Sequence, residues 1–218
     1  HPKDGEKFTG LIRIARPGWR TSVFAVKDGD FPQDLFEFDG AMITGSPASV
    51  RSGAPWVVQL LDLIRDAHAR NFPLFGACFG HQAIALALGG GMDLNPDGWV
   101  HGLTRNKLLN RPDWAAPLPD EVKLYGSHCE CVRKLPMGAA AFSASGGVNT
   151  GFTLGSHIFT TQHHPEMTHD FITALTKEMQ QTLGPEAYAR ALDSLAGRSD
   201  QQAFAESLAR FFEQARQP

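Results

Sequence analysis

The chain has 218 residues, of which 42% are hydrophobic and 20% are charged, and its formal net charge is −3. This composition is typical of one globular α/β domain spanning residues 1–218 with enough apolar material for a core. A small negative charge excludes a basic surface for nucleic acid, no apolar run reaches the roughly 18–20 residues of a membrane helix, and residues 1–5 do not read as a signal peptide.

The cysteines favour a reducing compartment and give no metal pattern. Cys78, Cys129 and Cys131 form an odd set in which two members lie two positions apart, so a disulfide scaffold is not expected and we place the protein in the cytoplasm. Structural zinc needs ligands spaced in recognisable pairs. The segment Cys129–Cys131 beside His128 lacks a second half, so we expect neither a metal nor a cofactor.

The first half of the chain alternates between predicted strands and helices. In chain order, the residue pattern predicts a helix over 4–16, strands over 22–26 and 39–45, a helix over 56–70, a strand at 74–75 and a helix over 81–88. A strand–helix–strand–helix order is the signature of a parallel sheet covered by helices.

The second half of the chain predicts shorter strands and then helices. Strands are expected around 122–125, 140–143 and 157–161, followed by helices over 168–183, 185–195 and 200–215. The shorter strands suggest an antiparallel extension of the sheet, and residues 168–218 form a helical C-terminal segment. The expected fold class is therefore α/β, a three-layer sandwich of one domain.

Cys78 lies in the pattern Gly-x-Cys-x-Gly, between a predicted buried strand and a predicted helix. This is the pattern of a nucleophile elbow, in which glycines on either side allow a sharp, strained turn. The turn exposes the nucleophile at the N-terminus of the helix, where backbone N–H groups favour a thiolate. The backbone N–H of Phe79 then points to where an oxyanion would form. A lone cysteine is more often a small buried hydrophobe, but this context favours a nucleophile.

A base and an acid are available where the strand at 157–161 ends. Pro165 favours an extended conformation for His164, and in an extended chain residues i and i+2 project to one side. His164 and Glu166 are then neighbours, and the carboxylate can orient the imidazole toward the thiol. His163 projects to the opposite face on this argument, although an early bend of the turn would bring it to Glu166 instead.

Four segments together resemble the class I glutamine amidotransferases, which include the amidotransferase half of GMP synthase. They are Asp-Gly-Ala-Met-Ile-Thr-Gly-Ser-Pro at 39–47, Pro-Leu-Phe-Gly-Ala-Cys-Phe-Gly-His-Gln at 73–82, Ser-His-Cys-Glu-Cys-Val at 127–132 and Gln-His-His-Pro-Glu at 162–166. The resemblance implies a mainly parallel, flavodoxin-like central sheet extended by antiparallel strands. It also implies cleavage of the side-chain amide of glutamine, with release of ammonia.

The resemblance also implies roles for the residues that match. Cys78 would be the nucleophile, His164 its base and acid, and Glu166 the carboxylate that orients the imidazole. The oxyanion would be held by backbone N–H groups of Phe79 and of Ser46. The reaction would pass through a γ-glutamyl thioester on Cys78.

The same resemblance implies where a γ-glutamyl substrate would lie. Gly45 belongs to the oxyanion loop, and Gln82 corresponds to the position that contacts bound glutamine. Ser127 and His128 would border the α-amino and carboxylate end, largely through their backbone.

The sequence departs from the family pattern at several places. Gly-Ser-Pro at 45–47 stands where many relatives have Gly-Gly-Pro, Glu130 replaces the usual Asp, and 99–102 lacks an acid often found there. The family opens with a central strand, whereas this sequence opens with a predicted helix. We expect that strand to precede His1, because without it neighbouring edges would be unpaired.

Other functions stay open at this level. The sequence contains no synthetase domain, so glutamine hydrolysis would need a separate acceptor or synthetase subunit, or would be a stand-alone reaction. Stand-alone members with a Gly-Ser-Pro loop resemble γ-glutamyl peptidases that act on glutathione-like substrates. A domain that only binds its ligand is the non-enzymatic alternative. An α/β-hydrolase is disfavoured because there the acid precedes the histidine by a long stretch.

Overall fold

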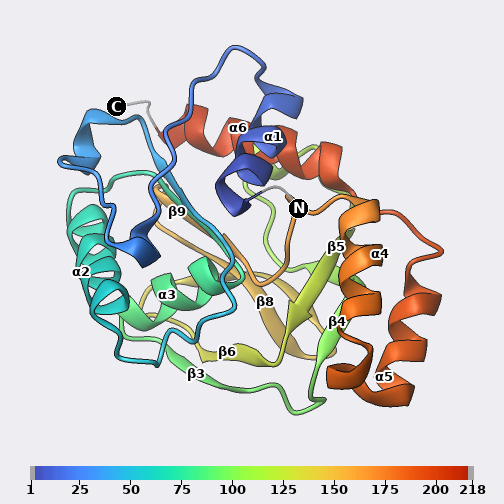
Figure 1. Ribbon diagram of the computed structural model, residues 1–218. Coiled ribbons are helices and arrows are strands. Elements are labelled where there is room, and N and C mark those ends of the chain that lie inside the picture. The colour runs from blue at the N-terminus through green and yellow to red at the C-terminus, as the bar shows by residue number, and fades with distance from the viewer. Residues whose placement is uncertain (1–2, 216–218) are drawn as a thin grey trace.

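The computed structural model describes residues 3–215 and is built around a seven-stranded mixed sheet (Figure 1). Its strands are between three and nine residues long, within the usual range for globular proteins. In spatial order the strands are β1 (Ala41–Ile43), β2 (Leu74–Ala77), β9 (Ile158–Thr161), β8 (Val148–Leu154), β7 (Ala140–Ser145), β4 (Val100–Leu108) and β5 (Glu121–His128). A separate antiparallel pair consists of β3 (Gly91–Leu94) and β6 (Glu130–Lys134).

The sheet changes from parallel to antiparallel at β9. The pairs β1–β2 and β2–β9 are parallel, whereas β9–β8, β8–β7, β7–β4 and β4–β5 are antiparallel. The expected α/β class, with a parallel part extended by antiparallel strands, is confirmed. The parallel part comprises β1, β2 and β9, so the antiparallel extension is larger than the sequence suggested.

Six α-helices are described, together with short 3-10 turns, and both faces of the parallel part of the sheet are covered by helices (Figure 1). The α-helices are α1 (Asp4–Ala15), α2 (Pro55–Ala69), α3 (Phe79–Ala87), α4 (His169–Glu178), α5 (Gln180–Ser194) and α6 (Gln201–Ala215). The 3-10 turns are η1 (Val26–Asp28), η2 (Leu35–Glu37) and η3 (Asp113–Ala115). In α5 the backbone is kinked at Gly184, where φ is 72°.

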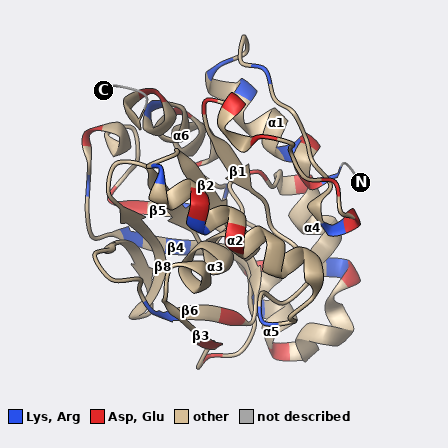
Figure 2. Ribbon diagram, turned by 90° about the vertical axis from the view of Figure 1, so that its left-hand side faces the viewer, with Lys and Arg blue, Asp and Glu red and all other residues tan. Residues whose placement is uncertain are grey.

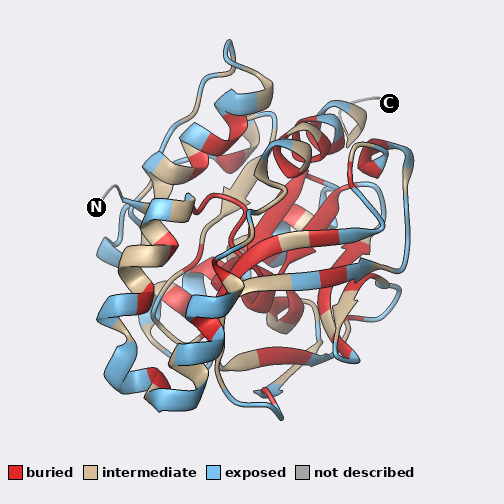
Figure 3. Cartoon of the chain, turned by 90° about the vertical axis from the view of Figure 1, so that its right-hand side faces the viewer, coloured by how far each residue is buried: buried red, intermediate tan, exposed pale blue. Residues whose placement is uncertain are grey.

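Alternation along the parallel strands produces the three layers. Leu74 and Ile158 pack in one buried cluster with α2 and α3, while Phe75 and Phe159 pack in a second cluster with α1 and α6. Successive residues of a strand point to opposite faces, so an almost wholly apolar strand must be covered on both sides. Figure 3 shows the result, with buried strands inside and exposed residues on the outer faces of the helices.

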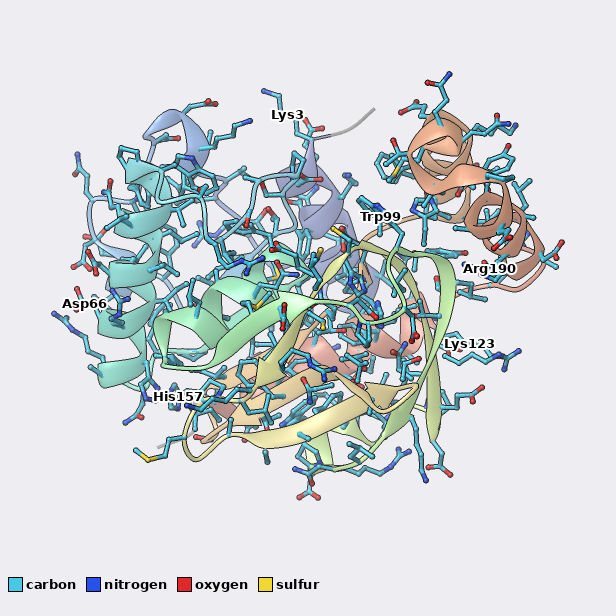
Figure 4. The ribbon with its side chains drawn as sticks, turned by 90° about the horizontal axis from the view of Figure 1, so that it is seen from below. Lys3, Asp66, Trp99, Lys123, His157 and Arg190 are labelled. Atoms are coloured by element: carbon cyan, nitrogen blue, oxygen red, sulfur yellow. The ribbon has the colours of Figure 1, made fainter. Side chains whose placement is uncertain are left out.

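The antiparallel end of the sheet lies beside α4 and α5 (Figure 1). β5 is the edge strand there, and its Lys123 points outward at the rim of the molecule (Figure 4). A charged side chain on an edge strand opposes pairing with another chain. The Lys123 backbone is also covered, because it exchanges two hydrogen bonds of 2.7 and 2.8 Å with Asp200.

The expected strand over 22–26 is wrong. Residues 21–25 are neither helix nor strand and lead into η1, and no strand of the described residues precedes Ala41. The segment finds no neighbouring strand to pair with. Phe24 instead packs edge-on against Phe38, with ring centroids 5.8 Å apart, while Val23 stays 58% exposed.

Two further properties of the described chain bear on its partners. None of its helices combines the length and the apolar character that a bilayer crossing requires. Lys and Arg are interspersed with Asp and Glu on the face seen in Figure 2, so that face carries no band of a single sign.

Candidate active site

Cys78 occupies a strained turn between β2 and α3. Its φ of 49° and ψ of −104° lie in a region that side chains rarely adopt, and the side chain is only 6% exposed. The flanking residues Gly76 and Gly80 must be glycine because other backbone atoms lie where a Cβ would be. A Cβ on Gly76 would come within 2.6 Å of the Gly80 backbone, and one on Gly80 within 2.2 Å of the Ile43 carbonyl oxygen.

The start of α3 is arranged to receive negative charge. Cys78 is the N-cap of α3, and its carbonyl oxygen accepts the first helical hydrogen bond, from the Gln82 N–H at 3.1 Å. The N–H groups before Gln82, that of Phe79 included, have no partner within the helix. They face the same end as the sulfur, where the helix dipole is positive. The Phe79 ring is held by stacking on Trp56, 5.5 Å between centroids.

His164 lies beside both Cys78 and Glu166. The imidazole Nδ1 donates to Glu166 Oε1 at 2.7 Å, the nearby Cys78 side chain also acts on the pKa of the imidazole, and the backbone N–H of His164 donates to the Tyr125 carbonyl oxygen at 2.8 Å. His164 and Glu166 are both buried, with side chains 8% and 1% exposed. Burial lowers the pKa of His164, but the charges of Glu166 and Cys78 outweigh burial and raise that pKa well above its ordinary value.

His163 lies on the other side of the chain, as the alternation of side chains predicts. Its Nε2 is 2.7 Å from Asn106 Oδ1, and burial lowers its pKa well below the ordinary value. Burial likewise lowers the pKa of His81 to about 3 and of His128 to about 4. These imidazoles stay neutral at physiological pH, whereas the pKa of His164 is shifted in the opposite direction.

The loop after β1 brings Gly45 against Cys78 and His164. A Cβ on Gly45 would lie 2.6 Å from His164 Cε1 and 3.7 Å from Cys78 Cβ. Ser46 is next in the loop, and its hydroxyl accepts a hydrogen bond from the Ala48 N–H at 3.2 Å. This hydroxyl contact turns the Ser46 side chain back onto its own loop, so the side chain is accommodated where many relatives have glycine.

Glu130 anchors that loop to β6. Its carboxylate accepts a hydrogen bond from the Ser49 hydroxyl at 3.2 Å and forms an ion pair with Arg51. Its carbonyl oxygen accepts from Gln82 Nε2 at 3.1 Å and from His128 Nδ1 at 3.0 Å. The residue that departs from the family's usual Asp therefore connects three segments of the site.

Gln82 and Ser127 are engaged with other protein groups. Gln82 is 5% exposed, and besides the Glu130 carbonyl its amide nitrogen also reaches Gln162 Oε1 at 3.3 Å. The Ser127 hydroxyl lies 3.1 Å from His101 Nδ1 and 3.6 Å from the sulfur of Met179, at the junction of α4 and α5. The C-terminal helices thus border this edge of the site.

Gln162 is the residue of the site to which no sequence pattern assigned a role. Its amide nitrogen lies 3.8 Å from Cys78 Sγ, and its side chain is fully buried. A glutamine two positions before His164, at the end of an apolar strand, is the signal that could have pointed to it. Elsewhere, Cys129 and Cys131 are free thiols, and residues 3–215 contain no cluster of three or more metal-ligating side chains.

Comparison with known proteins shows the family. The family described as "Glutamine amidotransferase class-I" matches residues 13–174. Gamma-glutamyl peptidase 3 of Arabidopsis thaliana is 30% identical over 71% of this chain and 66% of its own length. One subunit of the glutamine-hydrolysing GMP synthase of Saccharolobus solfataricus is 30% identical over 63% of this chain and 72% of its own length.

Solved structures agree with the fold. A glutamine amidotransferase from Methylobacillus flagellatus superposes with a TM-score of 0.77 and 24% identity, covering 98% of this chain and 88% of its own. One from Thermotoga maritima gives a TM-score of 0.77 at 18% identity, over 95% of this chain and 90% of its own. The resemblance drawn from the four sequence segments is confirmed: the chain belongs to the class I glutamine amidotransferase family.

Proposed function

We propose that this chain hydrolyses the γ-glutamyl amide bond of a small molecule through a thioester on Cys78. The observation that carries the proposal is the cluster of the elbow thiol, His164 and the buried carboxylate of Glu166: Glu166 binds the imidazole at 2.7 Å, and Gly45 lies against both His164 and Cys78. A buried imidazole whose pKa is raised by a carboxylate and a neighbouring sulfur suits a thiolate–imidazolium nucleophile. Cys78, His164 and Glu166 would then act as a catalytic triad.

The reaction would follow from these contacts. The Cys78 sulfur attacks the γ-carbonyl carbon, and the carbonyl oxygen takes the negative charge beside the N–H groups of Phe79 and Ser46. The C–N bond breaks as His164 gives its proton to the leaving nitrogen. His164, now neutral, accepts a proton from water, whose oxygen attacks the thioester and releases the γ-carboxylate and the Cys78 sulfur.

Glutamine is the first candidate substrate, with ammonia as the leaving group. Gly45, Gln82, Ser127 and His128 would border it, and a separate acceptor or synthetase subunit would consume the ammonia. The similarity to part of a GMP synthase supports this proposal. The three free thiols support a reducing, cytoplasmic setting.

A γ-glutamyl peptide, such as glutathione, is the second candidate. Gamma-glutamyl peptidases 3 and 4 of Arabidopsis thaliana are 30% and 29% identical to this chain, and this similarity favours a peptide substrate. The nucleophile and the thioester are the same for both candidates. They differ in the leaving group, which is ammonia in one case and an amine of a peptide in the other.

The test is a product screen with matched variants. The purified chain is incubated with glutamine, glutathione or folate polyglutamate, and products are identified by mass spectrometry. Cys78→Ala and His164→Ala should abolish turnover, whereas His163→Ala should spare most of it. Loss of activity in His163→Ala but not in His164→Ala would overturn the assignment. If iodoacetamide labels Cys78 no faster than an ordinary thiol and no substrate is cleaved, the domain is a binding module instead.

A further inference from the structure

Gln162 places a hydrogen-bond donor beside the candidate nucleophile. It directly follows β9, its side chain is 0% exposed, and its Nε2 lies 3.8 Å from Cys78 Sγ. Sulfur accepts hydrogen bonds at longer distances than oxygen, and a thiolate accepts better than a thiol. The inference that follows rests on the proposed function, since it concerns the charged state of the same sulfur.

Neighbouring groups determine which end of the Gln162 amide faces the sulfur. The Glu130 carbonyl oxygen can only accept, so the atom of Gln82 that approaches it at 3.1 Å must be the donating nitrogen. That nitrogen also donates to the Gln162 amide at 3.3 Å, which must therefore present its oxygen. The remaining end of the Gln162 amide, the Nε2–H group, is the one directed at Cys78.

The backbone fixes the separation between the two residues. The Gln162 N–H donates to the Thr150 carbonyl on β8 at 2.8 Å, and the Cys78 N–H donates to the Thr161 carbonyl on β9 at 2.9 Å. Donor and sulfur are thus both tied to the end of β9 rather than to a mobile loop. A donor held in place before the reaction costs no reorganisation when charge develops.

We propose that Gln162 is a positioning residue whose Nε2–H donates to the Cys78 sulfur, favours its thiolate form and fixes the direction in which it points. The sulfur then has two donors, the imidazolium of His164 and the amide of Gln162. Gln82 acts one step further away, because its two hydrogen bonds keep the Gln162 amide from turning its oxygen toward the sulfur.

The test measures the thiolate without any substrate. The full chain is alkylated with iodoacetamide at pH 7 and at pH 10, and labelling of Cys78 is followed on its tryptic peptide. Cleavage after Arg70 and Arg105 separates this peptide from the other two cysteines. Gln162→Leu should slow alkylation at pH 7 about tenfold, the effect of one hydrogen bond to a charged group. At pH 10 the rate should approach that of the wild type, because the thiol ionises without help.

Gln162→Glu keeps the size of the side chain and replaces the donor by a carboxylate, so it should slow alkylation at pH 7 at least as much. Gln82→Met should give a smaller loss at pH 7, since it frees the Gln162 amide to turn. Ser143→Ala is the matched control: it removes a buried hydroxyl that bonds to the Thr150 hydroxyl at 3.0 Å, and alkylation should not change.

A structural role alone would lower the alkylation rate by the same factor at both pH values. That result overturns the proposal, as do wild-type rates in both folded variants. Because no γ-glutamyl compound takes part, this outcome is independent of the product screen. A chain that cleaves no substrate but loses alkylation in these variants would refute the proposed function and support the role of Gln162.

Discussion

Replacing Gly45 by alanine inserts a methyl group into the contact between Cys78 and His164. The new Cβ would lie 2.6 Å from His164 Cε1, whereas ordinary contact begins near 3.4 Å, so the imidazole must move by about 0.8 Å. Gly45 does not have a positive φ, and its backbone accepts alanine without strain. A displacement of about 1 Å in a catalytic group typically costs on the order of 100-fold in rate. We therefore expect Gly45→Ala to lower kcat about 100-fold.

The assay is steady-state hydrolysis of whichever γ-glutamyl compound the product screen identifies, with a melting curve for each variant. Gly10→Ala is the matched control, because nothing lies within 4 Å of a Cβ at this exposed position of α1. That variant should keep full activity and gain about 0.5–1 kcal/mol in the free energy of unfolding. Activity of folded Gly45→Ala within about threefold of the wild type would refute the reasoning.

Three further changes test other parts of the structure. Glu166→Gln removes a negative charge that raises the pKa of His164. Because the imidazolium is lost as pH rises through the pKa of His164, the alkaline limit of the kcat profile should move to lower pH in this variant. An unmoved alkaline limit would contradict this role of Glu166. Glu130→Ala frees the loop after β1 and should lower kcat/KM about tenfold while the melting temperature changes little, since the lost ion pair is partly exposed. Arg16→Met removes hydrogen bonds that lower the pKa of Glu206. It should lower the free energy of unfolding in urea by about 1 kcal/mol at pH 7, and by less as pH falls through the lowered pKa of Glu206. An equal loss of stability after Glu206 is protonated would exclude the ion pair as the cause.

The sequence pattern predicts best the helices whose apolar face can be read from residues close together in the chain. The helices over 4–16 and 56–70 were placed within two residues of α1 and α2, because their apolar spacing directly reflects the face that packs on the sheet. The strands β4 and β8 were not predicted. β4 carries Thr104, Arg105, Asn106 and Lys107 in sequence, and such a polar run becomes a strand only because β5 pairs with it along its length.

In the candidate site, too, contacts within a short segment can be predicted from the sequence, whereas contacts between distant segments cannot. The elbow at Cys78 is visible in the sequence because glycines at fixed offsets are required by contacts within one turn and its neighbouring strand. His164 and Glu166 pair as expected for residues two positions apart, but they do so across a turn in which the Met167 N–H bonds the His164 carbonyl oxygen at 3.4 Å, and not along the extended chain that the sequence predicted. The contacts of Gln162 with Gln82 and Cys78 join residues 80 and 84 positions apart, and no local pattern encodes them.

The most direct test of the proposed chemistry is to detect the covalent intermediate on Cys78. The chain is mixed with excess glutamine or glutathione, quenched in acid within the first turnover, and digested with trypsin. We predict one γ-glutamyl group in thioester linkage on the peptide that carries Cys78, absent from Cys78→Ala and removed by hydroxylamine. Substrate turnover with no such group on Cys78, or turnover retained in Cys78→Ala, would contradict the central claim.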